Sequence, residues 1–154
     1  MPDVLGIDHI YVTVSNMERS ERFYDAVMQA LGFRKNEFQI DGEKHIQYYN
    51  RQFGYVLRPA RGKEKHNPYA PGLHHLCFRV EGEAEVKAAA RMLKEANIPV
   101  SEPRRYAEYA PDYFAVFFSD PDGIRLEITN YRKERRERHD HWETSDPKLG
   151  TDHD

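Results

Sequence analysis

Two histidines and one glutamate stand at positions from which their side chains could surround a metal ion. His9, His75 and Glu127 each lie in a short segment where polar and apolar residues alternate, as they do in a half-buried β-strand. Neutral imidazole nitrogens with one carboxylate oxygen suit Zn, Mn, Fe(II), Co or Ni and leave positions for water or substrate. Cys77 is the only cysteine, which excludes a site built from sulfur alone. One divalent metal ion is therefore the expected cofactor.

The alternation also predicts which way these side chains point, because successive residues of a strand face opposite sides of the sheet. Apolar residues recur at every second position in three segments, as Ile10, Val12 and Val14, as Leu76, Phe78 and Val80, and as Ile124, Leu126 and Ile128. The opposite face of each strand then carries His9, His75 or Glu127. We expect these three side chains to converge on one polar face, and we expect His74 to lie outside the strand or to point the other way.

The elements that must position these residues occur twice in the chain. A strand over 7–14 is followed by a helical pattern over 17–33, which Ser15 or Asn16 could cap and Gly32 could end. A strand over 75–80 is followed by a second helical pattern, over 83–98, in which Asn97 stands where Gly32 stood. Three strand-like runs follow each helix, at 33–38, 45–49 and 54–59 and again at 100–106, 112–120 and 123–130. The turn Asp120–Gly123 predicts a hairpin between the last two.

Each half therefore predicts a βαβββ module, and the fold class is α+β. A module of this size cannot bury its sheet face alone, so two modules must pack together or enclose a shared space. We expect two tandem modules forming a cup-shaped mixed sheet around a metal cavity. The domain would span residues 1–131, with module one at 5–60, a linker at 61–71 and module two at 72–131. A charged tail at 132–154 would begin as a solvated helix.

Composition narrows the class of partner. The chain has 154 residues, a formal net charge of −3 and a charged fraction of 32%. Neither a basic patch for nucleic acid nor an apolar run of the roughly 20 residues that span a membrane is present in the sequence. The N-terminus lacks the pattern of a signal peptide, and the single cysteine fits a reducing cytoplasm. A small-molecule substrate is the expected partner, with no nucleic acid and no membrane.

At this point the residues carry a resemblance to a known family. The order of elements, the histidine at the head of each module and the sequence DPDGIRLEI at 120–128 resemble the glyoxalase/bleomycin-resistance/dioxygenase group, also called the vicinal oxygen chelate superfamily. The resemblance covers about residues 5–131. In that family the first-strand histidine of each module and the glutamate of the last strand bind metal, which implies His9, His75 and Glu127 here.

One departure from the family concerns a fourth ligand that many members carry on the last strand of module one. Aligning GYVLR with GIRLE places Arg58 where Glu127 lies in module two. Arginine remains charged and offers no lone pair, so it cannot bind a cation. The chain therefore resembles members that use two histidines and one glutamate. Arg58, Arg125 or Arg79 would instead orient an anionic group of the substrate. Tyr113 or Tyr109 could transfer a proton or donate a hydrogen bond to a metal-bound oxygen.

Several functions remain open on the sequence. The favoured one is a metal-dependent lyase, isomerase or ring-cleaving dioxygenase that chelates a small oxygen-bearing, anionic substrate. A thiol transferase to an epoxide would need a thiol or potassium pocket that the sequence does not show. The alternative outside enzymes is a metal-free protein that sequesters a drug, as bleomycin-resistance members do. The modules could pair within one chain, or His9 could meet His75 and Glu127 across a homodimer.

Overall fold

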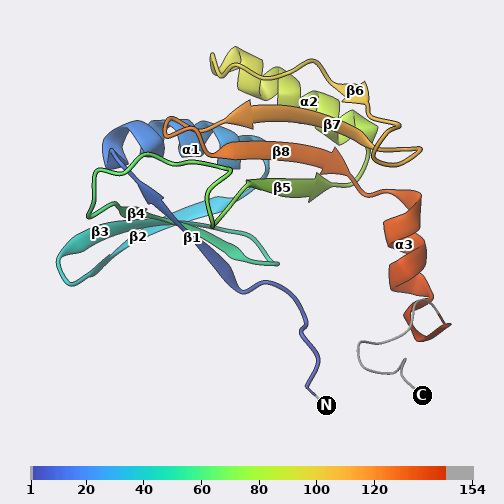
Figure 1. The fold of residues 1–154 in the computed structure, drawn as a ribbon, viewed down its shortest axis with the longest axis horizontal. Coiled ribbons are helices and arrows are strands. Elements are labelled where there is room, and N and C mark those ends of the chain that lie inside the picture. Colours follow the sequence, from blue (N-terminus) through green and yellow to red (C-terminus); the bar gives the residue numbers. More distant parts are fainter. Residues whose placement is uncertain (1, 145–154) are drawn as a thin grey trace.

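The computed structural model describes residues 2–144 and contains two βαβββ modules in tandem, followed by a short C-terminal helix (Figure 1). Module one consists of β1 (His9–Val14), α1 (Met17–Ala30), β2 (Arg34–Ile40), β3 (Glu43–Tyr49) and β4 (Gly54–Pro59). Module two consists of β5 (His75–Val80), α2 (Glu83–Glu95), β6 (Arg104–Arg105), β7 (Phe114–Ser119) and β8 (Arg125–Asn130). The predicted α+β fold of two tandem modules is confirmed.

Each module forms its own four-stranded mixed sheet. The strand orders are β1-β4-β3-β2 and β5-β8-β7-β6, so the first strand of each module lies at an edge and pairs in parallel with the last. The strand expected over 100–106 is reduced to the two residues of β6. The edges of β1 and β5 that face away from β4 and β8 have no strand partner within the described chain.

Local signals in the sequence explain where the two long helices begin and end. The side chain of Asn16 accepts a hydrogen bond from the Arg19 amide and so caps α1. Gly32 and Asn97 follow the two helices with φ values of +77° and +59°, the left-handed conformation that ends a helix and that glycine and asparagine adopt most easily. These helix ends are confirmed. The buried stripe of α2 consists of Val86, Ala89, Ala90 and Leu93, as predicted.

The two modules share one hydrophobic core. The ring of Phe78 in β5 packs within 6.0–6.4 Å of Phe33, Phe53 and Tyr55 of module one, measured between ring centroids. The Tyr24 hydroxyl in α1 donates a hydrogen bond of 2.8 Å to the Asp120 carboxylate, and both residues are buried. The helix-facing sides of both sheets contribute to this core. Their polar sides therefore face away from it.

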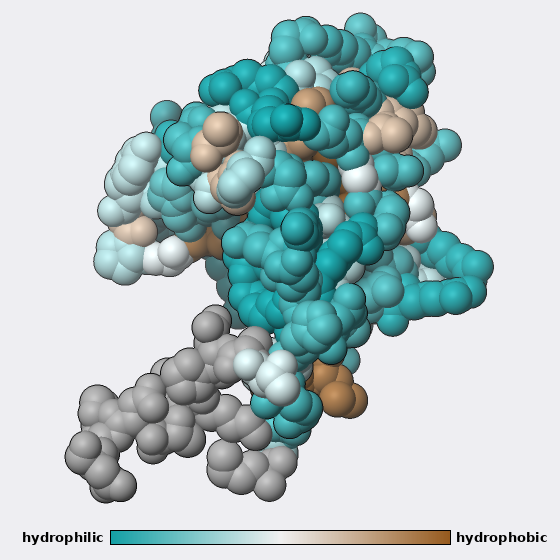
Figure 2. Space-filling view, turned by 90° about the vertical axis from the view of Figure 1, so that its right-hand side faces the viewer, coloured by the Kyte–Doolittle hydropathy of each residue, from teal (hydrophilic) through white to brown (hydrophobic). Residues whose placement is uncertain are grey.

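The C-terminal helix projects from the body of the molecule (Figure 1). It spans Lys133–Asp140, buries no side chain and is followed by a 3-10 turn at Trp142–Thr144, so the predicted solvated helix is confirmed. Residues 145–154 of the predicted tail lie outside the described residues. Figure 2 shows mainly hydrophilic residues on the side of the molecule from which this helix extends. Across residues 2–144, no helix is both long enough and apolar enough to cross a membrane.

Candidate metal centre

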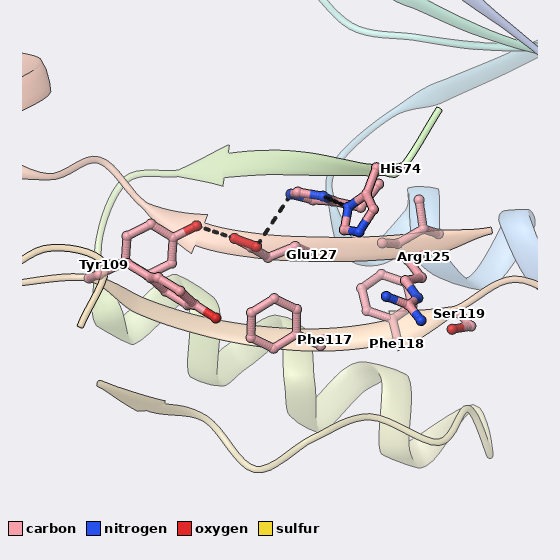
Figure 3. Close-up of a pocket in the computed structure, with 10 residues that line it drawn as sticks. His74, Tyr109, Phe117, Phe118, Ser119, Arg125 and Glu127 are labelled. Carbon is pink, nitrogen blue, oxygen red and sulfur yellow. Dashed lines mark hydrogen bonds and ion pairs between the residues drawn. The ribbon is translucent and has the colours of Figure 1, made fainter. Parts of the chain in front are cut away.

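Glu127 lies at the centre of a pocket on the polar face of the second sheet. β8 runs between β5 and β7, and this position leaves the Glu127 side chain only 4% exposed. Its Oε2 atom accepts hydrogen bonds from the Tyr113 hydroxyl and from the Cys77 thiol, the latter at 3.1 Å. Its Oε1 atom lies 3.9 Å from Nε2 of His75 (Figure 3). One oxygen of the carboxylate is thus held by protein donors, and the other faces a histidine.

His75 is oriented in a similar way. Its Nδ1 atom lies 2.8 Å from Nδ1 of His74, and the two rings meet edge to face. The ring of Tyr69, from the linker, packs against His74 with 5.5 Å between centroids. Contact with His74 therefore occupies one nitrogen of His75 and leaves Nε2 directed towards Glu127. A histidine fixed through its second nitrogen is the usual arrangement for a metal ligand.

The donor set fits a divalent metal ion in part. His75 Nε2 and Glu127 Oε1 offer one neutral nitrogen and one anionic oxygen, which suit Zn, Mn, Fe(II), Co and Ni. Within residues 2–144 of one chain, however, no group of three or more histidine, cysteine, aspartate or glutamate side chains lies close enough to hold an ion. A single chain therefore supplies two of the three predicted ligands at this pocket.

The structure does not bring His9 to the other two predicted ligands within one chain. His9 lines a different pocket, on the polar face of the first sheet, together with Tyr11 and Gln47. Its Nδ1 atom lies 2.7 Å from the Asp8 carboxylate, and its side chain is 52% exposed. Because the polar faces of the two sheets line separate pockets, the expected cup is not closed by one chain alone.

The strand register corrects the alignment that made Arg58 the equivalent of Glu127 in module one. In module one His9 pairs with Gly54 and Tyr11 with Val56, whereas in module two His75 pairs with Arg125 and Cys77 with Glu127. With the two histidines superposed, the counterpart of Glu127 is Val56, and Arg58 corresponds to Thr129. The glycines used for the alignment are not equivalent, because Gly123 belongs to the turn and lies two residues before β8. Valine offers no donor atom, so the prediction that module one supplies no fourth ligand is unchanged.

Arg58 itself is engaged in an ion pair. Its guanidinium lies 3.0 Å from the Glu43 carboxylate, which Arg61 also approaches to 2.6 Å. The hydrogen bond from Arg61 and the charges of both arginines lower the pKa of Glu43. Arg58 does not line the pocket of Glu127, so its predicted role in substrate binding has no support from the geometry of one chain and stays a prediction.

Tyr113 lies where the sequence predicts it, beside Glu127. Burial and the hydrogen bond to the carboxylate raise the pKa of Tyr113 above its usual range, so the phenol keeps its proton and acts as a donor. The guanidinium of the buried Arg132 packs on the face of the Tyr113 ring, 4.5 Å from its centroid, and so helps to hold the ring in place. Burial and the charge of Glu127 also raise the pKa of Cys77, which makes the thiol a poor nucleophile.

Replacement of Tyr113 by phenylalanine tests this arrangement. The variant should bind Mn²⁺ about 10–100-fold more weakly, the range typical for groups that orient a metal ligand. Titration followed by electron paramagnetic resonance would measure the affinity. Tyr109→Phe is the matched control, because Tyr109 lines the same pocket but is 62% exposed and donates no hydrogen bond to Glu127. Equal affinities for both variants would show that Tyr113 does not orient the carboxylate.

The sequence did not identify three features of this pocket. His74 was expected to lie outside the strand or to point the other way. It does lie just before β5, but its ring lines the pocket beside His75 (Figure 3). Arg132 carries no sequence signal, since it follows the last strand in a charged stretch. Ser119 faces the pocket because it pairs with Arg125 across β7 and β8. His45, which begins a strand-like run at 45–49, is buried on the other sheet, where it stacks on Phe38.

The pocket itself has a volume of about 720 Å³, within the range for small-molecule sites. Its floor consists of the polar face of β7 and β8, and Tyr109 lies at one end (Figure 3). Arg125 and Ser119 lie at the other end. Its lining residues are His74, His75, Tyr109, Tyr113, Phe117, Phe118, Ser119, Arg125, Leu126 and Glu127.

Comparison with known proteins identifies the family of the chain. Residues 6–128 match the model of the Glyoxalase/Bleomycin resistance protein/Dioxygenase superfamily. The chain is 30% identical over 151 residues to the metallothiol transferase FosB of Shouchella clausii, covering 95% of this chain and 92% of that protein. It is 27% identical over 124 residues to the uncharacterized protein YqjT of Bacillus subtilis, covering 78% and 94%.

A solved structure shares the fold. The glyoxylase/bleomycin resistance protein/dioxygenase domain from Frankia sp. EAN1pec superposes with a TM-score of 0.70 at 22% identity, covering 84% of this chain and all of that domain. The family model covers most of the chain, and the residues it spans include both histidines and the glutamate of the candidate site. The chain belongs to the Glyoxalase/Bleomycin resistance protein/Dioxygenase superfamily.

Proposed function

We propose that the protein is a divalent-metal-dependent enzyme that chelates a small oxygen-bearing substrate. The observation that carries this proposal is the arrangement of two side chains in one pocket. His75 and Glu127 each have one polar atom engaged by a neighbouring side chain, and the remaining atoms, Nε2 and Oε1, face each other at 3.9 Å. Two ligand atoms oriented in this way suit a bound cation, which would attract both the lone pair of the imidazole nitrogen and the negative charge of the carboxylate.

The third ligand in this proposal is His9 of a second copy of the chain. β1 and β5 are edge strands, each with one side that no other strand of residues 2–144 pairs with, and such edges are open to pairing with another molecule. The segment before β1 also exposes Val4, Leu5 and Ile7. A two-fold axis that placed the first sheet of one copy against the second sheet of the other would complete two equivalent sites. Each site would then combine residues of two chains.

The chemistry follows from the pocket. A metal bound by His9, His75 and Glu127 would act as a Lewis acid and stabilise negative charge on the substrate's oxygens. Tyr113 holds Glu127 in place and keeps its own proton at neutral pH. Phe117 and Tyr109 supply aromatic surfaces in the same pocket. These residues bind and orient a small molecule whose oxygens face the ligand atoms.

The reaction class that receives most support is a lyase or group transfer without a change in oxidation state. The similarity to a protein named metallothiol transferase favours this class. Ring cleavage by a dioxygenase would need redox-active Fe or Mn, so the identity of the native metal separates the two. A cytoplasmic location stays a prediction that rests on the single cysteine.

Elemental analysis of protein purified without chelator tests the proposal. We expect about one equivalent of a divalent transition metal per chain, which is two per dimer, after reconstitution if not before. Zn, Ni or Co would support Lewis-acid chemistry, Fe would support oxygen chemistry, and Mn would be compatible with both. If no metal binds after reconstitution, the enzyme proposal is wrong, and a metal-free protein that sequesters a ligand becomes the better account.

A further inference from the structure

Arg125 is a positively charged side chain in the pocket of the proposed metal ligands. It precedes Glu127 by two residues on β8, so both side chains stand on the same face of the sheet. Its Nη1 atom donates a hydrogen bond of 3.1 Å to the Tyr69 hydroxyl, and its guanidinium lies 5.1 Å from the centre of the Tyr69 ring. The linker residue thus steadies the guanidinium where it lines the pocket (Figure 3).

No carboxylate among residues 2–144 forms an ion pair with Arg125, in contrast to Arg58, and Arg125 differs from Arg79 in lining the pocket. Arg58 pairs with Glu43. Arg79 stacks on the ring of Tyr131 at 4.1 Å and lies outside this pocket. Within residues 2–144, Arg125 has a tyrosine partner but no carboxylate partner. Arg125 is exposed to solvent at the mouth of the pocket, so its guanidinium can be reached by an anionic group of a bound molecule and can form a charge-assisted pair with it.

Neighbouring groups add hydrogen-bond donors at the same place. Ser119 pairs with Arg125 across β7 and β8, and its side chain lines the pocket. Together, the guanidinium and the hydroxyl could bind two oxygens of a carboxylate, a phosphonate or a phosphate. Figure 3 shows both residues at the end of the pocket away from Tyr109.

The spacing of the strand sets the length of a matching ligand. Residues two apart on one face of a strand are separated by roughly 7 Å, so an anion at Arg125 would lie about that far from oxygens held near Glu127. Phe117 pairs with Glu127 across the strands and offers an aromatic surface beside this path. A flat or short apolar spacer would fit between the two polar ends.

Resting on the proposed function, we infer that the substrate is an oxygen chelator that also carries a carboxylate, phosphonate or phosphate, and that Arg125 binds this anionic group. Arg125 is then a residue that determines substrate specificity within the metal pocket. Of the three arginines that the sequence suggested for this role, the inference selects Arg125, because Arg58 and Arg79 do not line the pocket of Glu127.

Two matched ligands test the inference. Catechol chelates a metal through two hydroxyls, and protocatechuate is the same molecule with a carboxylate opposite one of them. Mn²⁺-loaded protein would be titrated with each under anaerobic conditions. Wild type should bind protocatechuate about 10–100-fold more tightly, as expected for one charge-assisted pair. Arg125→Gln should abolish this preference without changing catechol binding, and Arg125→Lys should retain part of it, because lysine keeps the charge but not the fork of donors.

Arg91→Gln is the matched control, since Arg91 lies on the exposed face of α2 outside the pocket and should leave the preference unchanged. Equal binding of the two ligands to wild type, failure of both to bind, or a preference that survives in Arg125→Gln would each overturn the inference. If Mn²⁺ binds while the preference is absent, only the anion site is wrong. If wild type binds no metal, the proposed function fails, and this inference fails with it.

Discussion

Replacing Glu127 by glutamine is expected to weaken Mn²⁺ binding by more than about 100-fold, beyond the range for groups that merely orient a ligand. The amide has nearly the shape of the carboxylate but lacks its charge and is a poor ligand for these ions. It can still accept the hydrogen bonds that Tyr113 and Cys77 donate to Oε2. The variant should therefore remain folded while it loses the metal.

The measurement combines a metal titration with thermal unfolding of the metal-free protein. Glu95→Gln is the matched control, because Glu95 is an exposed residue at the end of α2 and does not line the pocket. Wild type should be stabilised by added Mn²⁺, as any protein is by a ligand that binds only its folded state, and Glu127→Gln should not be. An unchanged affinity in Glu127→Gln would remove Glu127 from the site.

Combining two variants that each lack one metal ligand in a single heterodimer is expected to restore metal binding. In the proposed dimer, each site takes His9 from one chain and both His75 and Glu127 from the other. A heterodimer of His9→Ala and Glu127→Ala chains then contains one site in which all three ligands are intact. It should bind about one metal ion per pair of chains, half of the wild-type content, whereas either homodimer should bind none tightly.

Co-expression of differently tagged chains and purification through both tags would isolate this heterodimer for elemental analysis. A heterodimer of His75→Ala and Glu127→Ala chains is the matched control. Both residues belong to module two, so each of its sites lacks one ligand and no metal should be recovered. If His9→Ala alone binds metal as wild type does, His9 is not a ligand. If the first heterodimer stays empty, the site is not shared between chains.

The repeat of the fold could be predicted from the sequence because its signals are local. Alternation of apolar residues marks β5 at the residues observed, and the capping residue Asn16 and the left-handed residues Gly32 and Asn97 mark the helix ends. β6 was predicted too long, since whether a strand pairs depends on its neighbour and not on its own residues. The predicted ligands His75 and Glu127 do face the same pocket, because strand alternation decides which side of a sheet a residue occupies.

Only the tertiary structure decided what these residues meet. Alternation placed His9 on a polar face, but in the folded chain that face lines a different pocket from Glu127, so one chain does not bring the three predicted ligands together. The register of β4 against β1, and not the matching of glycines, showed that Val56 is the counterpart of Glu127. The different partners of Arg58 and Arg125 depend on contacts between residues far apart in the chain, which a pattern of neighbouring residues does not encode.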